Sequence, residues 1–159
     1  MTNSGASRNY WDEKFRLDQY LMSTPHSPIP RRFYRVAYQR LEEAEVLSNA
    51  GYYIGTVYLA GYAVECMLKA LILNSSPKKD HETVAAEFRG QRAHQYEWLR
   101  HRYAQTNAAG LPVAVSESLL IVATWDTSLR YKPGLGDPTD ASRFLEEVNK
   151  ILEWADNRI

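Results

Sequence analysis

The stretch Gly51–Leu73 reads GYYIGTVYLAGYAVECMLKALIL, and it decides the fold of this chain. Its residues are apolar or small on nearly every side of a helix, and Glu65 and Lys69 are its only formal charges. A helix of this composition is normally buried by its neighbours. We therefore predict that it is the central helix around which the rest of the chain packs.

At helical spacing this segment has two faces. One face carries small and aliphatic residues, among them Ala60, Val64 and Leu68. The adjoining face is more polar and consists of Tyr58, Tyr62, Glu65 and Lys69. A plain ion pair explains Glu65 and Lys69, which stand one turn apart in the favourable order, and the alternative is a polar patch in a groove of the bundle.

Other segments also have the apolar period of a helix. They are a long helix that begins after Pro30 and is closed by Asn49–Gly51, a short one over 82–88, one through Tyr96–Tyr103 and a last one over 139–157. Leu111–Leu129 is strongly apolar, so we expect it to be buried as well. No stretch alternates for long at the period of a strand. The expected class is all-α, an up-and-down bundle of four to five helices joined by short loops.

Residues 1–30 are expected to form an N-terminal arm ahead of the bundle, which takes up residues 31–159. Within the arm, Arg8–Met22 fits a short helix. The prolines that follow it are Pro25, Pro28 and Pro30. They predict an extended connector, because a proline fixes its own backbone and biases the preceding residue away from the helix.

The length of 159 residues suits one domain with a core of its own. Nineteen Lys and Arg balance nineteen Asp and Glu, so no global charge steers the protein onto nucleic acid. Cys66 is the single cysteine, which excludes an internal disulfide, and we expect no metal and no cofactor. The N-terminus lacks the apolar core of a signal peptide, and Glu65 and Lys69 interrupt the best bilayer-span candidate. We therefore expect a cytoplasmic protein without membrane contact.

Several short motifs, taken in order, resemble the HEPN superfamily. They are Ala44–Leu47 with Gly51–Tyr53, then Gly61–Leu71, then Arg92–Tyr96 with Leu99, and finally Arg130–Tyr131 with Pro133. The resemblance covers Phe33–Asp156. It implies a four- or five-helix bundle, commonly a homodimer, that is associated with nucleotides or RNA. Some family members are metal-independent ribonuclease toxins, and some pair with a small nucleotidyltransferase encoded beside them.

The ribonuclease members carry an Arg and a His four to six residues apart, and Arg89 and His94 have that spacing here. A histidine that titrates near neutral pH can take the proton from a ribose 2′-hydroxyl, while an arginine stabilises charge on the phosphate. In those members the pair lies late in the bundle, where this chain has Arg130 and no histidine after it. The alternative is that His94 is structural or caps a loop.

Arg130 and Tyr131 suit binding better than catalysis. An arginine beside a tyrosine can grip a phosphate while the ring stacks on a base. The alternative is that Arg130 pairs with a buried carboxylate, for which Glu65 is the candidate. The expected nucleotide or RNA site consists of Tyr62, Glu65, Lys69, Arg130 and Tyr131.

The leading functional hypothesis is a dimeric binding or partner module for RNA or nucleotides, in a toxin–antitoxin or defence setting. The alternative is a metal-independent ribonuclease toxin that uses Arg89 and His94. A third hypothesis is a structural role, in which the bundle docks a nucleotidyltransferase.

Overall fold

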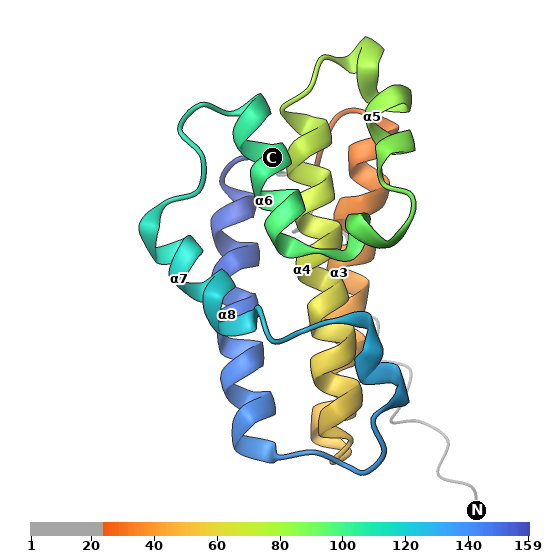
Figure 1. Ribbon diagram of the computed structural model, residues 1–159, viewed down its shortest axis with the longest axis vertical. Coiled ribbons are helices and arrows are strands. Elements are labelled where there is room, and N and C mark those ends of the chain that lie inside the picture. The colour runs from red at the N-terminus through yellow and green to blue at the C-terminus, as the bar shows by residue number, and fades with distance from the viewer. Residues whose placement is uncertain (1–23) are drawn as a thin grey trace, which may run out of the picture.

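The structure is a computed structural model that describes residues 24–159, and every regular element in that range is helical. Three long helices run along the molecule, namely α3 (Pro28–Asn49), α4 (Tyr53–Asn74) and α8 (Pro138–Asp156) (Figure 1). The shorter helices are α5 (His81–Glu87), α6 (Tyr96–Thr106) and α7 (Val113–Val122). Three 3-10 turns join them, η1 (Lys78–Asp80), η2 (Gln91–His94) and η3 (Thr127–Tyr131). The expected all-α bundle is confirmed, while the helix predicted within residues 8–22 lies outside the described range.

Helix α4 is the central element, as its composition predicts. It packs against α3, α6 and α8 and also contacts α5 and η3. Every residue from Ala63 to Leu73 is buried. By length and composition alone α4 would suit a membrane span, which corrects the expectation that Glu65 and Lys69 interrupt any such stretch. However, 78% of its most apolar 18-residue window is buried inside the protein, as expected of a core helix.

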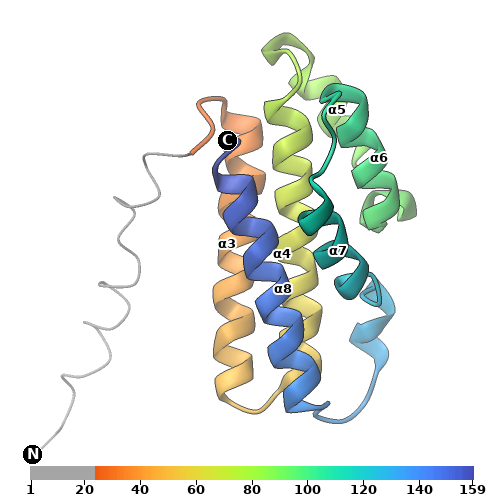
Figure 2. The same ribbon diagram turned by 90° about the vertical axis from the view of Figure 1, so that its left-hand side faces the viewer.

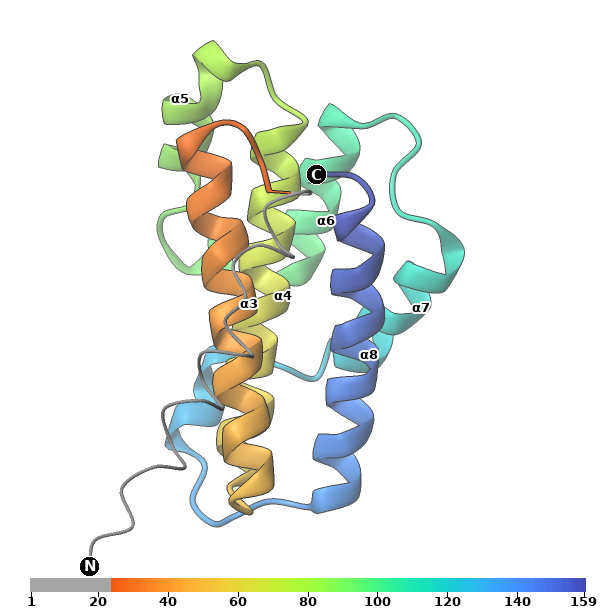
Figure 3. The same cartoon turned by 180° about the vertical axis from the view of Figure 1, so that it is seen from behind.

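Helices α3 and α4 form an antiparallel hairpin, which Figure 3 shows from behind. Gly51 ends α3 with a φ of 82°, the left-handed conformation predicted for this position. The start of α3 differs from the expectation, because Pro28 and Pro30 lie in its first turn and not in an extended connector. Proline is tolerated there, since the first N–H groups of a helix have no partner within it.

Helix α7 is shorter than the apolar stretch that contains it. It ends at Val122, and the chain then turns before η3. Val115 and Leu119 are buried on the side of α7 that packs on α8, whereas Leu120 on another side is 74% exposed. The expectation that Leu111–Leu129 is buried throughout is therefore wrong at Leu120, because α7 covers the outside of the bundle (Figure 2).

The loop after η3 closes onto the start of α4. The backbone N–H of Ile54 donates to the carbonyl oxygen of Leu135 over 2.9 Å, which satisfies a donor in the first turn of α4. Gly136 has a φ of 89°, and a Cβ there would lie 3.0 Å from the Ile54 nitrogen. Only glycine fits both conditions. This closure holds η3 against α4.

Candidate functional site

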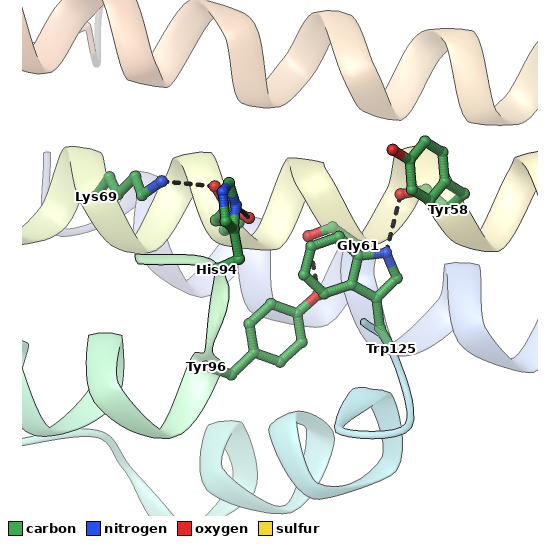
Figure 4. A network of polar contacts seen from close by, with 7 residues as sticks. Tyr58, Gly61, Lys69, His94, Tyr96 and Trp125 are labelled. Carbon is green, nitrogen blue, oxygen red and sulfur yellow. Dashed lines mark hydrogen bonds and ion pairs between the residues drawn. The ribbon is translucent and has the colours of Figure 1, made fainter. Parts of the chain in front are cut away.

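The polar face of α4 is centred on Glu65, a carboxylate whose side chain is only 3% exposed. One of its oxygens, Oε1, lies 2.5 Å from Nζ of Lys69, one turn along the helix. The other, Oε2, accepts a hydrogen bond of 3.0 Å from Nδ1 of His94, at the end of η2 (Figure 4). The structure therefore contains the expected Glu65–Lys69 pair and adds a partner that comes from a separate segment.

His94 is the accessible member of this group, with a side chain that is 41% exposed. A carboxylate can only accept, so the proton lies on Nδ1, and a neutral ring then has its lone pair on Nε2. The ring borders a surface hollow of about 330 Å³, which is also lined by Arg100 and Leu120. His94 can thus exchange a proton at Nε2 with a molecule at the surface.

Lys69 is buried together with Glu65. Its ammonium also lies 5.6 Å from the centre of the Phe88 ring, within the range of a cation–π contact. The ammonium of Lys69 is therefore paired with the Glu65 carboxylate inside the bundle.

Tyr62 connects the carboxylate end of this face to the arginine end. Its ring meets those of His94 and Tyr58 edge to face, with centroids 6.2 Å and 5.2 Å away. Burial raises the pKa of Tyr62 well above its ordinary range, Tyr58 adds to this rise, and the positive charge of Arg130 opposes it. The Tyr62 hydroxyl therefore stays protonated at physiological pH and remains a hydrogen-bond donor.

Arg130 lies over the ring of Tyr131, with 4.8 Å between the guanidinium carbon and the ring centroid. Hydrogen bonds with Tyr131 and with Tyr58 hold the pKa of Arg130 above its ordinary value. The alternative in which Arg130 pairs with Glu65 is wrong, because Lys69 and His94 occupy that carboxylate. Within residues 24–159 no carboxylate forms an ion pair with Arg130.

The Arg130–Tyr131 pair is open to solvent. The ring of Tyr131 is 75% exposed. Beside Arg130 lies a second hollow of about 340 Å³, lined also by Tyr52, Tyr58 and Lys132. Two cations and three aromatic rings thus meet at one edge of the bundle.

Two aromatic residues outside the expected site, Tyr96 and Trp125, support this face. The Tyr96 hydroxyl donates to the Gly61 carbonyl over 2.8 Å, and Trp125 Nε1 donates to the Tyr58 carbonyl over 3.0 Å (Figure 4). Their rings stack with centroids 5.2 Å apart. A Cβ on Gly61 would lie 2.1 Å from the Trp125 ring. A glycine inside an apolar helix was the available signal that a bulky group packs there.

Within residues 24–159, Arg89 shares no hydrogen bond with His94. It is exposed at the end of the segment that follows α5, and it makes no hydrogen bond or ion pair within the described part of the chain. The structure therefore joins His94 to the polar face of α4 through a hydrogen bond to Glu65, a contact that Arg89 does not share. In residues 24–159 no group of three or more His, Cys, Asp or Glu side chains could hold a metal ion.

A family model described as the HEPN domain matches residues 30–158, which includes all of the helical bundle except the first two residues of α3. No curated protein and no solved structure matches the chain.

Proposed function

The chain belongs to the HEPN domain family, which is generally associated with nucleotides or RNA, and on that premise we propose that it binds single-stranded RNA or a nucleotide. The observation that carries the proposal is the exposed Arg130–Tyr131 pair. Among residues 24–159, the hydrogen-bond partners of this arginine are tyrosines.

The chemistry of this pair suits a nucleotide. A guanidinium that is not committed to a carboxylate can donate two parallel hydrogen bonds to a phosphate. An exposed tyrosine ring can stack on a base of any sequence. Lys132 adds a second cation beside the hollow, and the Tyr58 hydroxyl adds a polar group. The hollow of about 340 Å³ beside Arg130 lies against the start of α4 and provides room for part of a nucleotide.

Binding of a fluorescein-labelled single-stranded RNA, followed by anisotropy at several salt concentrations, tests the proposal. Arg130→Ala should weaken binding and reduce the slope of log K against log salt by about one. Tyr131→Ala should cost about 1 to 3 kcal/mol of binding free energy, and Tyr131→Phe should restore most of it.

Arg158→Ala is the matched control. Arg158 lies 4.7 Å from the ring centroid of Trp154, so it is also an arginine on an aromatic ring, but at the other end of α8. The Arg158→Ala variant should bind RNA and mononucleotides with the same affinity as the natural chain. Equal affinity and equal salt slope for Arg130→Ala and the natural chain would refute the proposed binding site.

A metal-independent ribonuclease is the second candidate function, and the Glu65–His94 contact favours it. A carboxylate bonded to Nδ1 orients the ring and leaves Nε2 available as a general base, the arrangement used in many hydrolytic sites. Arg130 lies near the same face and can stabilise charge on a phosphate.

RNA incubated with the protein and EDTA tests this second candidate. Cleavage should be abolished in His94→Ala. Arg89→Ala should leave it unchanged, because Arg89 shares no hydrogen bond with His94 within residues 24–159. Loss of cleavage in Arg89→Ala would instead support the spacing motif of Arg89 and His94. Intact RNA across several substrates would reject catalysis.

The proposal extends to the setting of the protein, a cytoplasmic toxin–antitoxin or defence system with a nucleotidyltransferase as partner. Its support is the family relationship and not a feature of the bundle. Co-purification of the tagged chain with the product of a neighbouring nucleotidyltransferase gene tests it.

A further inference from the structure

A larger hollow lies between η3 and the start of α8, next to the hollow beside Arg130. Its volume of about 450 Å³ is within the range of pockets that hold small molecules. The two hollows share Ile54, Leu129 and Lys132 as lining residues. A ligand that is bound at Arg130 can therefore extend past Lys132 into the larger hollow.

The larger hollow has apolar walls that come from four separate elements. They are Tyr53 and Val57 of α4, Ile121 of α7, Leu129 of η3 and Phe144 of α8. A flat aromatic group that enters such a hollow leaves water by burying its faces against these side chains. Every nucleobase has two such faces, so the walls suit a base but do not choose among the four.

Two opposite charges lie at the rim of the larger hollow, Asp140 and Arg143. They stand three positions apart on α8, which is the spacing at which Glu97 and Arg100 form an ion pair. Within residues 24–159, however, neither the Asp140 nor the Arg143 side chain forms a hydrogen bond or an ion pair. The carboxylate of Asp137 also lines the hollow, but it accepts from the backbone N–H of Asp140 over 2.9 Å. The hollow thus offers one carboxylate and one guanidinium that a ligand can use together.

Guanine matches this pair of charges better than the other RNA bases do. Its O6 and N7 atoms accept the two parallel hydrogen bonds of an arginine. Its N1–H and its N2 amino group donate, and a carboxylate accepts from both. Adenine has an amino donor in place of O6, which an arginine cannot accept. Cytosine offers an amino group to a carboxylate but lacks the N7 acceptor, and uracil has no amino group.

We propose that the larger hollow binds the base of a second nucleotide and selects guanine. Asp140 and Arg143 contact the polar edges of the base, and Lys132 contacts the phosphate that joins this nucleotide to the one at Arg130. The inference rests on the proposed function and adds a base preference to it. In this arrangement Asp140 determines which RNA binds well, whereas Arg130 determines whether RNA binds.

Anisotropy of fluorescein-labelled short oligouridines tests the base preference. One RNA carries a single central guanosine, and the others carry an adenosine, a cytidine or a uridine at that place. The full chain should bind the guanosine RNA at least about tenfold more tightly than each of the others, as expected of a bidentate contact to a base. Inosine lacks only the N2 amino group of guanosine, so an inosine RNA should lose part of this preference.

Asp140→Ala should abolish the preference for guanosine over inosine, because the carboxylate that accepts from the N2 amino group is gone. It should not weaken the binding of plain oligouridine. Glu153→Ala is the matched control, since Glu153 is an exposed carboxylate of the same helix that does not line the larger hollow. The Glu153→Ala variant should keep the full preference, and circular dichroism should show equal helicity for all three chains.

Equal affinity of the natural chain for the four RNAs would overturn the inference, and so would an undiminished guanosine preference in Asp140→Ala. Both results leave the proposed function intact if Arg130→Ala still weakens binding. In contrast, a guanosine preference that requires Asp140 but not Arg130 would support the larger hollow and refute the binding site at Arg130. A natural chain that binds none of the RNAs would refute both proposals.

Discussion

Oε2 of Glu65 lies 3.0 Å from Nδ1 of His94, although the two residues are 29 positions apart in the chain. The carboxylate is in the buried central helix and the imidazole is in a short turn at the surface. The pair therefore fixes the turn η2 to α4. It also places an ionisable ring at the border between the core and a surface hollow.

Glu65→Ala should be strongly destabilising. It would leave the ammonium of Lys69 buried without its carboxylate, and breaking a buried ion pair in this way costs about 3 to 5 kcal/mol of unfolding free energy. Urea unfolding followed by circular dichroism measures the loss. Glu97→Gln removes a carboxylate from an exposed pair with Arg100 and should cost less than about 1 kcal/mol.

Replacing both buried charges should recover most of that loss. In Glu65→Leu with Lys69→Met, no buried charge is left unpaired, and such replacements are often neutral or stabilising. The double variant should unfold at a urea concentration close to that of the natural chain. A double variant no more stable than Glu65→Ala would show that the network around His94 contributes more than the ion pair does.

Gly61→Ala should destabilise the fold by about 1 to 3 kcal/mol, because the added Cβ would lie 2.1 Å from the ring of Trp125. Displacement of Trp125 should also change the tryptophan emission. Gly55→Ala, in the same helix, is the control. Its Cβ meets the flexible end of Leu47, so alanine should be neutral or slightly stabilising there. Equal unfolding midpoints for the two variants would contradict the packing of Trp125 on Gly61.

Cys66 should react slowly with thiol reagents in the native protein. Burial raises the pKa of its thiol from 9.0 to about 11, and the negative charge of Glu65 adds to the rise. At neutral pH the thiolate is then about a hundredfold rarer than for an ordinary cysteine. The measurement compares the rate of reaction with Ellman's reagent before and after unfolding in guanidinium chloride. Similar rates in both conditions would place Cys66 at the surface.

The Glu87–Arg102 contact should make a small contribution to stability that depends on pH. Two hydrogen bonds of 2.8 Å and 3.0 Å from Arg102 hold the pKa of Glu87 below its ordinary value of 4.5. A lowered folded-state pKa stabilises the protein above the unfolded-state value, and this stabilisation is lost as the pH falls through the folded-state value.

Glu87→Gln measures that contribution. Because the pair is partly exposed, the variant should be less stable than the natural chain by no more than about 1 kcal/mol at neutral pH. The difference should shrink as the pH falls below 4.5. A constant difference across this range would mean that the charge of Glu87 is not responsible.

The order of helices and the position of the core could be read from the sequence because both depend on local composition. Gly51–Leu73 contains too few polar residues to form an exposed helix. In the last helix, apolar residues that include Phe144, Val148 and Ile151 recur at helical spacing and form one buried face. The ion pair between Glu65 and Lys69 follows from a spacing of four within one helix.

The composition of the candidate site could not be read in this way. Sequence spacing predicted that Arg89 and His94 act as a pair, and charge suggested that Arg130 pairs with Glu65. Within residues 24–159, neither pair shares a hydrogen bond or an ion pair. The chain between α5 and α6 turns so that His94 reaches Glu65, and η3 places Arg130 on tyrosines. Such turns depend on packing between segments that are distant in the chain, and the hydrophobic periodicity of one segment does not predict it.

By itself, then, the sequence determined an all-helical chain with a buried central helix that has one polar face, because hydrophobic periodicity and short-range spacing are local properties. Only the tertiary structure decided which side chains complete that face. His94, Trp125 and Arg130 come from segments far along the chain, and their positions depend on how η2, α7 and η3 pack against α4.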